Sequence, residues 1–274
     1  MKRWNRRQRV LAGLILSVTF LAVVCIAGSL CTQQALTTDL SQKNIAPGAE
    51  HIFGTDWLGR DMLMRTLKGI SLSILIGILA AAVSTVIALV LGVASATLGK
   101  TVDSVITFVI DLVMGIPHML LLILISVAMG KGLTGVIVGV ALSHWPSLAR
   151  LIRAEVIQLK ESPYIQISER LGKSKWYIVK KHMLPHLLPQ FIVGLILLFP
   201  HAILHESSIT FLGFGLSTEQ PAIGIVLSES MQYLAMGRWW LALFPGIFLV
   251  ATVAVFYVMG QSVRKLIDPG SVHE

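Results

Sequence analysis

The sequence predicts an all-α integral membrane protein with six transmembrane helices and one polar segment outside the bilayer. Of its 274 residues, 55% are hydrophobic and only 13% are charged, whereas a soluble domain carries about 25% charged residues. The mean hydropathy is +0.78. The apolar residues also gather into runs close to the roughly 20 residues that a helix needs to cross a bilayer.

Six apolar runs are candidates for membrane spans. They cover residues 10–30, 72–98, 105–129, 133–149, 187–204 and 239–260. The first run is too long for a signal-peptide core, and no small-x-small cleavage site follows it, so we expect a retained anchor. The fourth and fifth runs are short, which leaves open that one of them is re-entrant. Pro117 is expected to kink the third run.

The basic residues predict the orientation. Most of the 22 Lys and Arg residues lie before the first run, between the fourth and fifth runs, and after the last run. Segments rich in Lys and Arg stay in the cytoplasm, so both termini are expected there. This distribution explains the net charge of +8 by the orientation of the chain in a lipid bilayer, which is its expected partner. It favours no nucleic acid, because no basic stretch is interleaved with aromatic residues.

The runs divide the chain into four parts. These are an N-terminal tail with the first transmembrane helix (1–31), an extracytoplasmic loop (32–70), a transmembrane core (71–265) and a cytoplasmic tail (266–274). Near the end of the loop, Asp56, Arg60 and Asp61 stand among glycines. We interpret this stretch as a tight, hydrogen-bonded turn that packs on the membrane face and performs no chemistry.

A polar island at 155–189 interrupts the second half of the chain. Ser162 and Pro163 are typical of a helix start, Gly172 of a helix end, and Ser174 of a second start. The island is therefore predicted to form a helix, a glycine corner and a second helix. It is too short and too charged to span a bilayer.

Two short strings, at 99–101 and 172–174, look like the end of a phosphate-binding loop. That loop needs a glycine five residues before its second glycine, and those places hold Ala94 and Ile167. We therefore expect this chain to bind no ATP, and no other cofactor.

Four polar side chains in the apolar runs are candidates for a substrate path. His201 and His205 are four residues apart, so they share one helix face, and Glu206 follows. Two imidazoles there could contact a metal ion or an anionic chelate, or could form interhelical hydrogen bonds worth about 0.6 kcal/mol each. Asp111 is costly inside a span and points to a functional or a pairing role. No metal-binding set is assigned, and His144 is expected to form interfacial hydrogen bonds.

The island resembles the EAA loop of ABC importer permeases. With Gly172 on the motif glycine, Leu184 and Pro185 fall on the motif's Leu-Pro, although His182 replaces the usual isoleucine. Further stretches resemble the second ("C"-type) permease subunit of dipeptide, oligopeptide and nickel importers. These stretches are 54–61, 210–213, 241–246 and 268–269.

This resemblance implies a type I ABC importer permease fold in a bacterial cytoplasmic membrane. The partners would be a homologous permease, two cytoplasmic ATPases that hold ATP and magnesium, and an extracytoplasmic binding protein. The chain itself would not be an enzyme. An ATPase would contact the coupling loop through Gln166, Ile167, Ser168, Glu169, Arg170, Leu171, Gly172, Lys173, Ser174, Leu184 and Pro185.

The sequence points to two classes of substrate. Two features resemble the nickel-type subunit: His144 with its two neighbours, and the pair His201 and His205. Glu206 instead resembles the peptide type. We expect nickel or a metal chelate, with a dipeptide or oligopeptide as the alternative.

Two other classes of membrane protein fit the sequence less well. A secondary transporter would show an inverted repeat and paired intramembrane charges, and neither is clear. A membrane-embedded metalloenzyme built on His201, His205 and Glu206 would lack further ligands and a general base.

Overall fold

The structure is a computed structural model that describes residues 5–267. Within this range the chain is helical, with one isolated β-bridge between Thr55 and Asp61. The helices are α1 (Arg6–Leu30), η1 (Leu40–Gln42), α2 (Met62–Thr97), α3 (Lys100–Gly115), α4 (His118–Ala128), α5 (Gly132–Lys160), α6 (Pro163–Arg170), α7 (Lys175–Ile178), η2 (Val179–Met183, a π-helix), α8 (Leu184–Phe211), α9 (Ile223–Leu234) and α10 (Trp240–Ile267).

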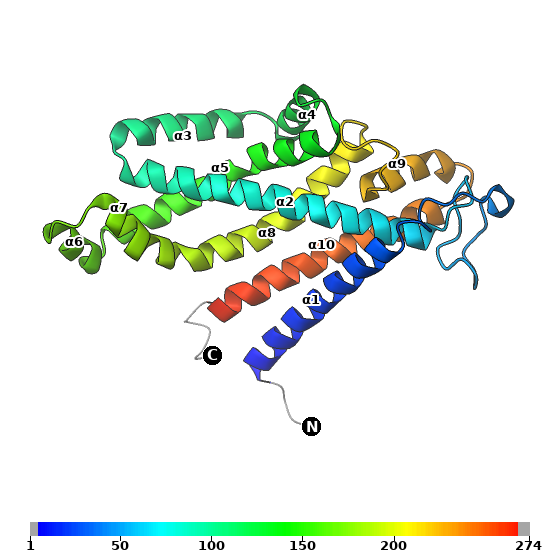
Figure 1. The fold of residues 1–274 in the computed structure, drawn as a ribbon, viewed down its shortest axis with the longest axis horizontal. Helices are drawn as coiled ribbons and strands as arrows, with labels where there is room; N and C mark the ends of the chain where they lie inside the picture. Colours follow the sequence, from blue (N-terminus) through cyan, green and yellow to red (C-terminus); the bar gives the residue numbers. More distant parts are fainter. Residues whose placement is uncertain (1–4, 268–274) are drawn as a thin grey trace.

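The predicted fold class is confirmed. Among the described residues, five helices are long and apolar enough to cross a membrane, or six if α3 and α4 are taken as one bent span. Figure 1 shows α2, α5 and α8 side by side, with α3 and α4 along one side of them and α1 and α10 along the other. The segment before α2 and the helix α9 lie at one end of this bundle, and α6 and α7 project from the opposite end.

The helix α2 begins ten residues before the predicted run because its first turn is capped. The Asp61 carboxylate accepts hydrogen bonds from the backbone N–H groups of Leu63 and Met64, which lack partners inside the helix. Farther along, a side chain at Gly92 would overlap with the Ala149 carbonyl. Glycine there lets the backbones of α2 and α5 approach closely, as small residues do between membrane helices.

The third run, 105–129, is bent more sharply than the predicted kink. The chain forms α3 and α4, whose axes differ by 99°. Ile116 is extended (φ −86°, ψ 134°), as expected for a residue before proline, and Pro117 has no N–H to continue the helix. The predicted kink lies in the right place, but it ends the helix outright.

The fourth and fifth spans are longer than predicted, and the broken span is the third one instead. The helix α5 has 29 residues and continues through Pro146 into the polar island, and α8 has 28 residues. The polar island therefore contributes its first turns to α5 and its last turns to α8.

The helix α8 continues past the fifth predicted run to Phe211. After a loop over 212–222 the chain forms α9, a helix that the sequence did not predict. A side chain at Gly224 would overlap with the Ser207 carbonyl, so α9 packs tightly on α8. The motif at 268–269 and nearly all of the predicted tail lie outside the described residues.

Candidate functional site

The α6–α7 end has the predicted helix, glycine corner and helix. Gly172 adopts a left-handed φ of +74° after the last turn of α6, a conformation that glycine accepts at little cost. The Ser174 side chain caps α7 by accepting from the Tyr177 N–H. Ser162 precedes α6, but its hydroxyl donates to the Leu159 carbonyl and does not cap the helix.

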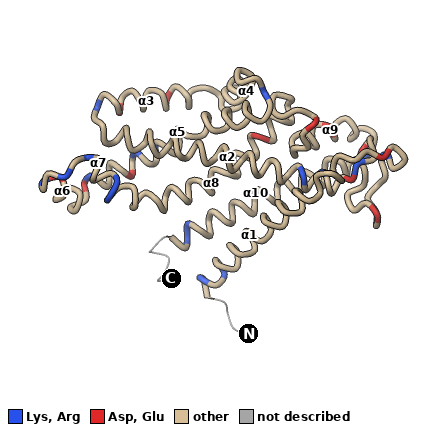
Figure 2. Tube along the Cα trace, viewed as in Figure 1, with Lys and Arg blue, Asp and Glu red and all other residues tan. Residues whose placement is uncertain are grey.

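The apolar stripe of α6 faces away from the bundle. Ile167 is 56% exposed and Leu171 73% exposed, whereas the neighbouring Ile165 is fully buried. Trp176 of α7 is 72% exposed. Large apolar side chains gathered on a projecting end are typical of an interaction surface. Figure 2 shows Lys and Arg at the same end.

His182, which replaces the motif isoleucine, holds the two short helices together. Its ring packs edge-on against Tyr164 of α6 and Tyr177 of α7, and its Nε2 lies 3.4 Å from the Ser168 hydroxyl. The motif residues Leu184 and Pro185 form the first turn of α8. The eleven predicted coupling residues therefore lie in α6, at the corner and at the start of α8.

Two of the candidate substrate-path residues have partners within the fold. Asp111 of α3 forms an ion pair with Arg150 of α5 at 2.6 Å, and both side chains are at least half exposed. Glu206 is fully buried, and its carboxyl accepts hydrogen bonds from Ser207 at 3.2 Å and Thr210 at 3.1 Å.

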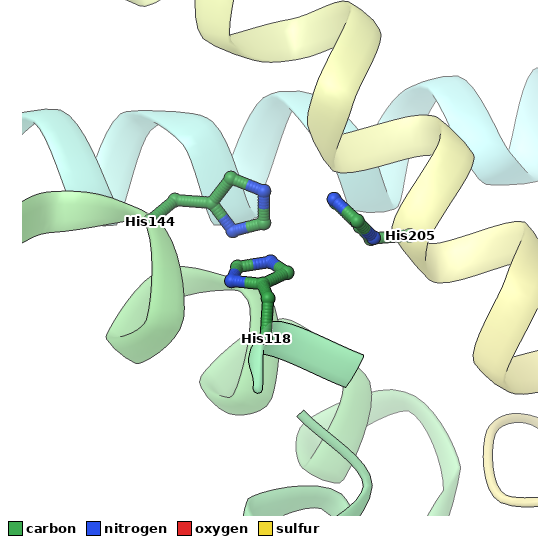
Figure 3. A group of neighbouring side chains, drawn as sticks. All are labelled: His118, His144 and His205. Atoms are coloured by element: carbon green, nitrogen blue, oxygen red, sulfur yellow. The ribbon is translucent and has the colours of Figure 1, made fainter. Parts of the chain in front are cut away.

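The two histidines of the predicted pair differ in burial. His201 is exposed, whereas His205 is half-buried and faces His118 and His144 (Figure 3). The ring centroid of His205 lies 4.4 Å from that of His118 and 5.0 Å from that of His144, and the latter two centroids are 4.6 Å apart. We call these three side chains the histidine cluster. One nitrogen of each ring lies within 4.8 Å of those of the other two.

The histidine cluster joins three segments. His118 is the first residue of α4, His144 lies in the middle of α5, and His205 lies near the end of α8. The cluster borders an open pocket of about 440 Å³ beside the α3–α4 break, and both His118 and His144 line it. Of these three histidines, only His205 was predicted from the sequence to lie in a substrate path. The spacing of residues does not show that the break at Pro117 brings His118 next to His144.

Comparison with known proteins places the chain in a family. The family described as "Binding-protein-dependent transport system inner membrane component" matches residues 73–272. The chain belongs to this family. It is also 31% identical to the dipeptide transport system permease protein DppC of Bacillus subtilis, over 98% of this chain and 84% of that protein.

Other relatives agree with this membership. The oligopeptide transport system permease protein OppC of Bacillus subtilis is 31% identical over 98% of this chain and 88% of its own length. The fold resembles a chain of the MetNI methionine ABC transporter, with a TM-score of 0.62, 18% identity, and coverage of 76% of this chain and 98% of that one. The chain is thus a permease component of a binding-protein-dependent transport system.

Proposed function

We propose that this permease forms half of the translocation path of an ATP-driven importer for dipeptides or oligopeptides. The relatives support a peptide cargo, because DppC and OppC are named as dipeptide and oligopeptide permeases and match almost the whole chain. They favour this alternative over the nickel or metal-chelate cargo expected from the sequence. A metal chelate stays the second candidate, because three imidazoles meet beside an open pocket.

The partners follow from the family. Its description names dependence on a binding protein, so an extracytoplasmic binding protein would deliver the substrate. A homologous permease would complete the path, and two cytoplasmic ATPases would hold the ATP and magnesium. The chain would lie in the bacterial cytoplasmic membrane with both termini inside, because its basic residues gather on that side.

The observation that carries the coupling role is the exposed apolar surface of the α6–α7 end. Ile167, Leu171 and Trp176 are each more than half exposed. We propose that this surface docks on an ATPase. Closure of the ATPase pair would then push α6 and α7 and rock the bundle between its two facing states. The push would pass into α5 and α8, the long helices that flank the loop.

A glycine substitution tests the docking. Gly172→Asp would place a charged side chain on the corner, and we expect uptake to be abolished and ATPase co-purification lost while the chain still inserts in the membrane. Gly237→Asp is the matched control, because both glycines have a similar positive φ and open space around them, and Gly237 lies between α9 and α10 at the other end of the bundle. Normal uptake by Gly172→Asp would contradict the docking role.

The cargo is tested separately. Uptake of a labelled dipeptide and of radioactive nickel should be compared in cells with and without this chain. We expect deletion to stop dipeptide uptake and leave nickel uptake intact. The opposite pattern would overturn the peptide proposal and support the second candidate.

A further inference from the structure

We propose that His118, His144 and His205 form a binding site for a divalent late first-row transition-metal ion, such as Ni²⁺, Co²⁺, Cu²⁺ or Zn²⁺. The ligands would be one imidazole nitrogen from each residue. Imidazole suits these metals better than it suits Mg²⁺ or Ca²⁺, which prefer oxygen ligands. The site does not depend on the peptide proposal, because it concerns binding by this chain and not the cargo.

The hydrogen bonds of His144 leave one nitrogen available as a ligand. Its Nδ1 lies 2.9 Å from the Val140 carbonyl oxygen, which can only accept, so Nδ1 carries the proton. In the neutral ring Nε2 then holds a lone pair. A metal-binding histidine typically donates its other N–H to a backbone carbonyl in this way, which fixes the tautomer and the ring orientation. The Ser143 hydroxyl, 3.0 Å from Nδ1, lies on the same side of the ring.

Two nitrogens of the cluster are buried without a hydrogen-bond partner. Among the described residues, neither the Nε2 atom of His118 nor that of His144 has a hydrogen-bond partner. A buried polar atom without a partner costs about 1–3 kcal/mol. A metal ion bound between these rings, whose planes are nearly perpendicular, would accept the lone pairs of both nitrogens.

The distances permit coordination after a small movement. Metal–nitrogen bonds of about 2.1 Å in a tetrahedral site place ligand nitrogens about 3.4 Å apart, compared with a present upper limit of 4.8 Å. His118 can supply this movement because it follows the break at Ile116 and Pro117, where no continuous helix holds it.

The surroundings favour a metal ion over an anion. An anion needs N–H donors, but the N–H of His144 is already bonded to Val140. His144 lies 12 residues from the start of α5, about 18 Å along the helix, and hence deep within the span. Three protein nitrogens also leave a fourth position for water or a chelator, as in other open metal sites, and the adjacent pocket offers the room.

Metal binding by the purified transporter tests this site. The complete complex, stripped with a chelator and placed in lipid nanodiscs, should be titrated with Co²⁺ and followed by visible absorption. We expect one site per copy of this chain, with the intense bands of a low-coordinate Co²⁺ ion. Each of His118→Gln, His144→Gln and His205→Gln should weaken binding at least tenfold. His186→Gln is the matched control, because His186 is an exposed histidine at the opposite end of α8.

A second measurement starts from the wild-type complex. Cu²⁺ bound to the wild-type complex should show hyperfine coupling to three imidazole nitrogens by electron paramagnetic resonance. The proposal would be overturned if no coupled nitrogens appeared, or if a correctly assembled triple variant kept the same spectrum. Dipeptide uptake does not enter either readout, so failure of the peptide proposal and failure of this site are distinguishable.

Discussion

The two ends of the bundle differ in which side chains they bury and which they expose. At the end that carries the segment before α2, charged side chains are buried and pair with one another. Asp56 is fully buried and accepts from Arg60 and from Arg65 at 2.6 Å each, and Arg65 also reaches Glu229 of α9 at 2.9 Å. The guanidinium groups of Arg60 and Arg65 both lie within 6 Å of the Trp57 ring centroid. At this end the buried charged groups pair with one another within the chain.

The α6–α7 end leaves apolar side chains outside. Its buried side chain Ile165 anchors α6, while Leu171 and Trp176 are more than two-thirds exposed. The difference shows where buried charge holds the fold together and where apolar side chains are left exposed. The first end joins α2 to α9 through its buried ion pairs. The second is held in shape by caps and by His182 and presents its apolar face outward.

The largest loss of stability is expected from breaking the buried ion pairs that join Asp56, Arg65 and Glu229. Arg65→Ala would leave Asp56 without one of its two cationic partners and Glu229 without its closer one. Removing one member of a buried pair costs about 3–5 kcal/mol, so we expect a clearly lower unfolding midpoint of the purified transporter. Lys43→Ala, an exposed change in the same segment, should leave the midpoint within experimental error. Equal midpoints for the two variants would show that the network does not stabilise this end.

A smaller loss of stability is expected when either of two glycines with the same backbone conformation is replaced by alanine. Gly59 (φ +74°) and Gly172 (φ +74°) differ in their surroundings: a side chain at Gly59 would overlap with the Asp39 carbonyl, and one at Gly172 meets open space. Gly59→Ala should therefore cost about 2–4 kcal/mol, from strain and overlap together. Gly172→Ala should cost about 1–2 kcal/mol, from strain alone. Thermal unfolding of both variants measures the difference, and a larger loss for Gly172→Ala would reverse the comparison.

The smallest effect is expected away from both ends, where α3 meets α5. Asp111 and Arg150 are largely exposed, and exposed ion pairs contribute about 0–1 kcal/mol. Asp111→Asn should therefore barely change the unfolding midpoint or the uptake of labelled dipeptide. A strong loss of uptake with an unchanged midpoint would instead support the predicted role of Asp111 in the substrate path.

Features that depend on local sequence were predictable. The glycine corner at Gly172 and the cap at Ser174 follow from the conformations that single residues prefer. The break at Pro117 was placed correctly for the same reason. Its angle was not predictable, because it depends on how α3 and α4 pack against α2 and α5. The helix α9 was missed because its buried side chains, such as Ile223 and Val226, are too few to read as a span.

The sequence by itself determined that the chain lies in a membrane, roughly where it crosses, and where a polar corner leaves the bundle. Hydrophobic length and turn-forming residues act over a few neighbours, so they can be read in one dimension. Only the tertiary structure decided that His205 meets His118 and His144, and that Arg65 reaches Glu229. These contacts join residues far apart in the chain, and they form only when helices pack at particular angles and distances.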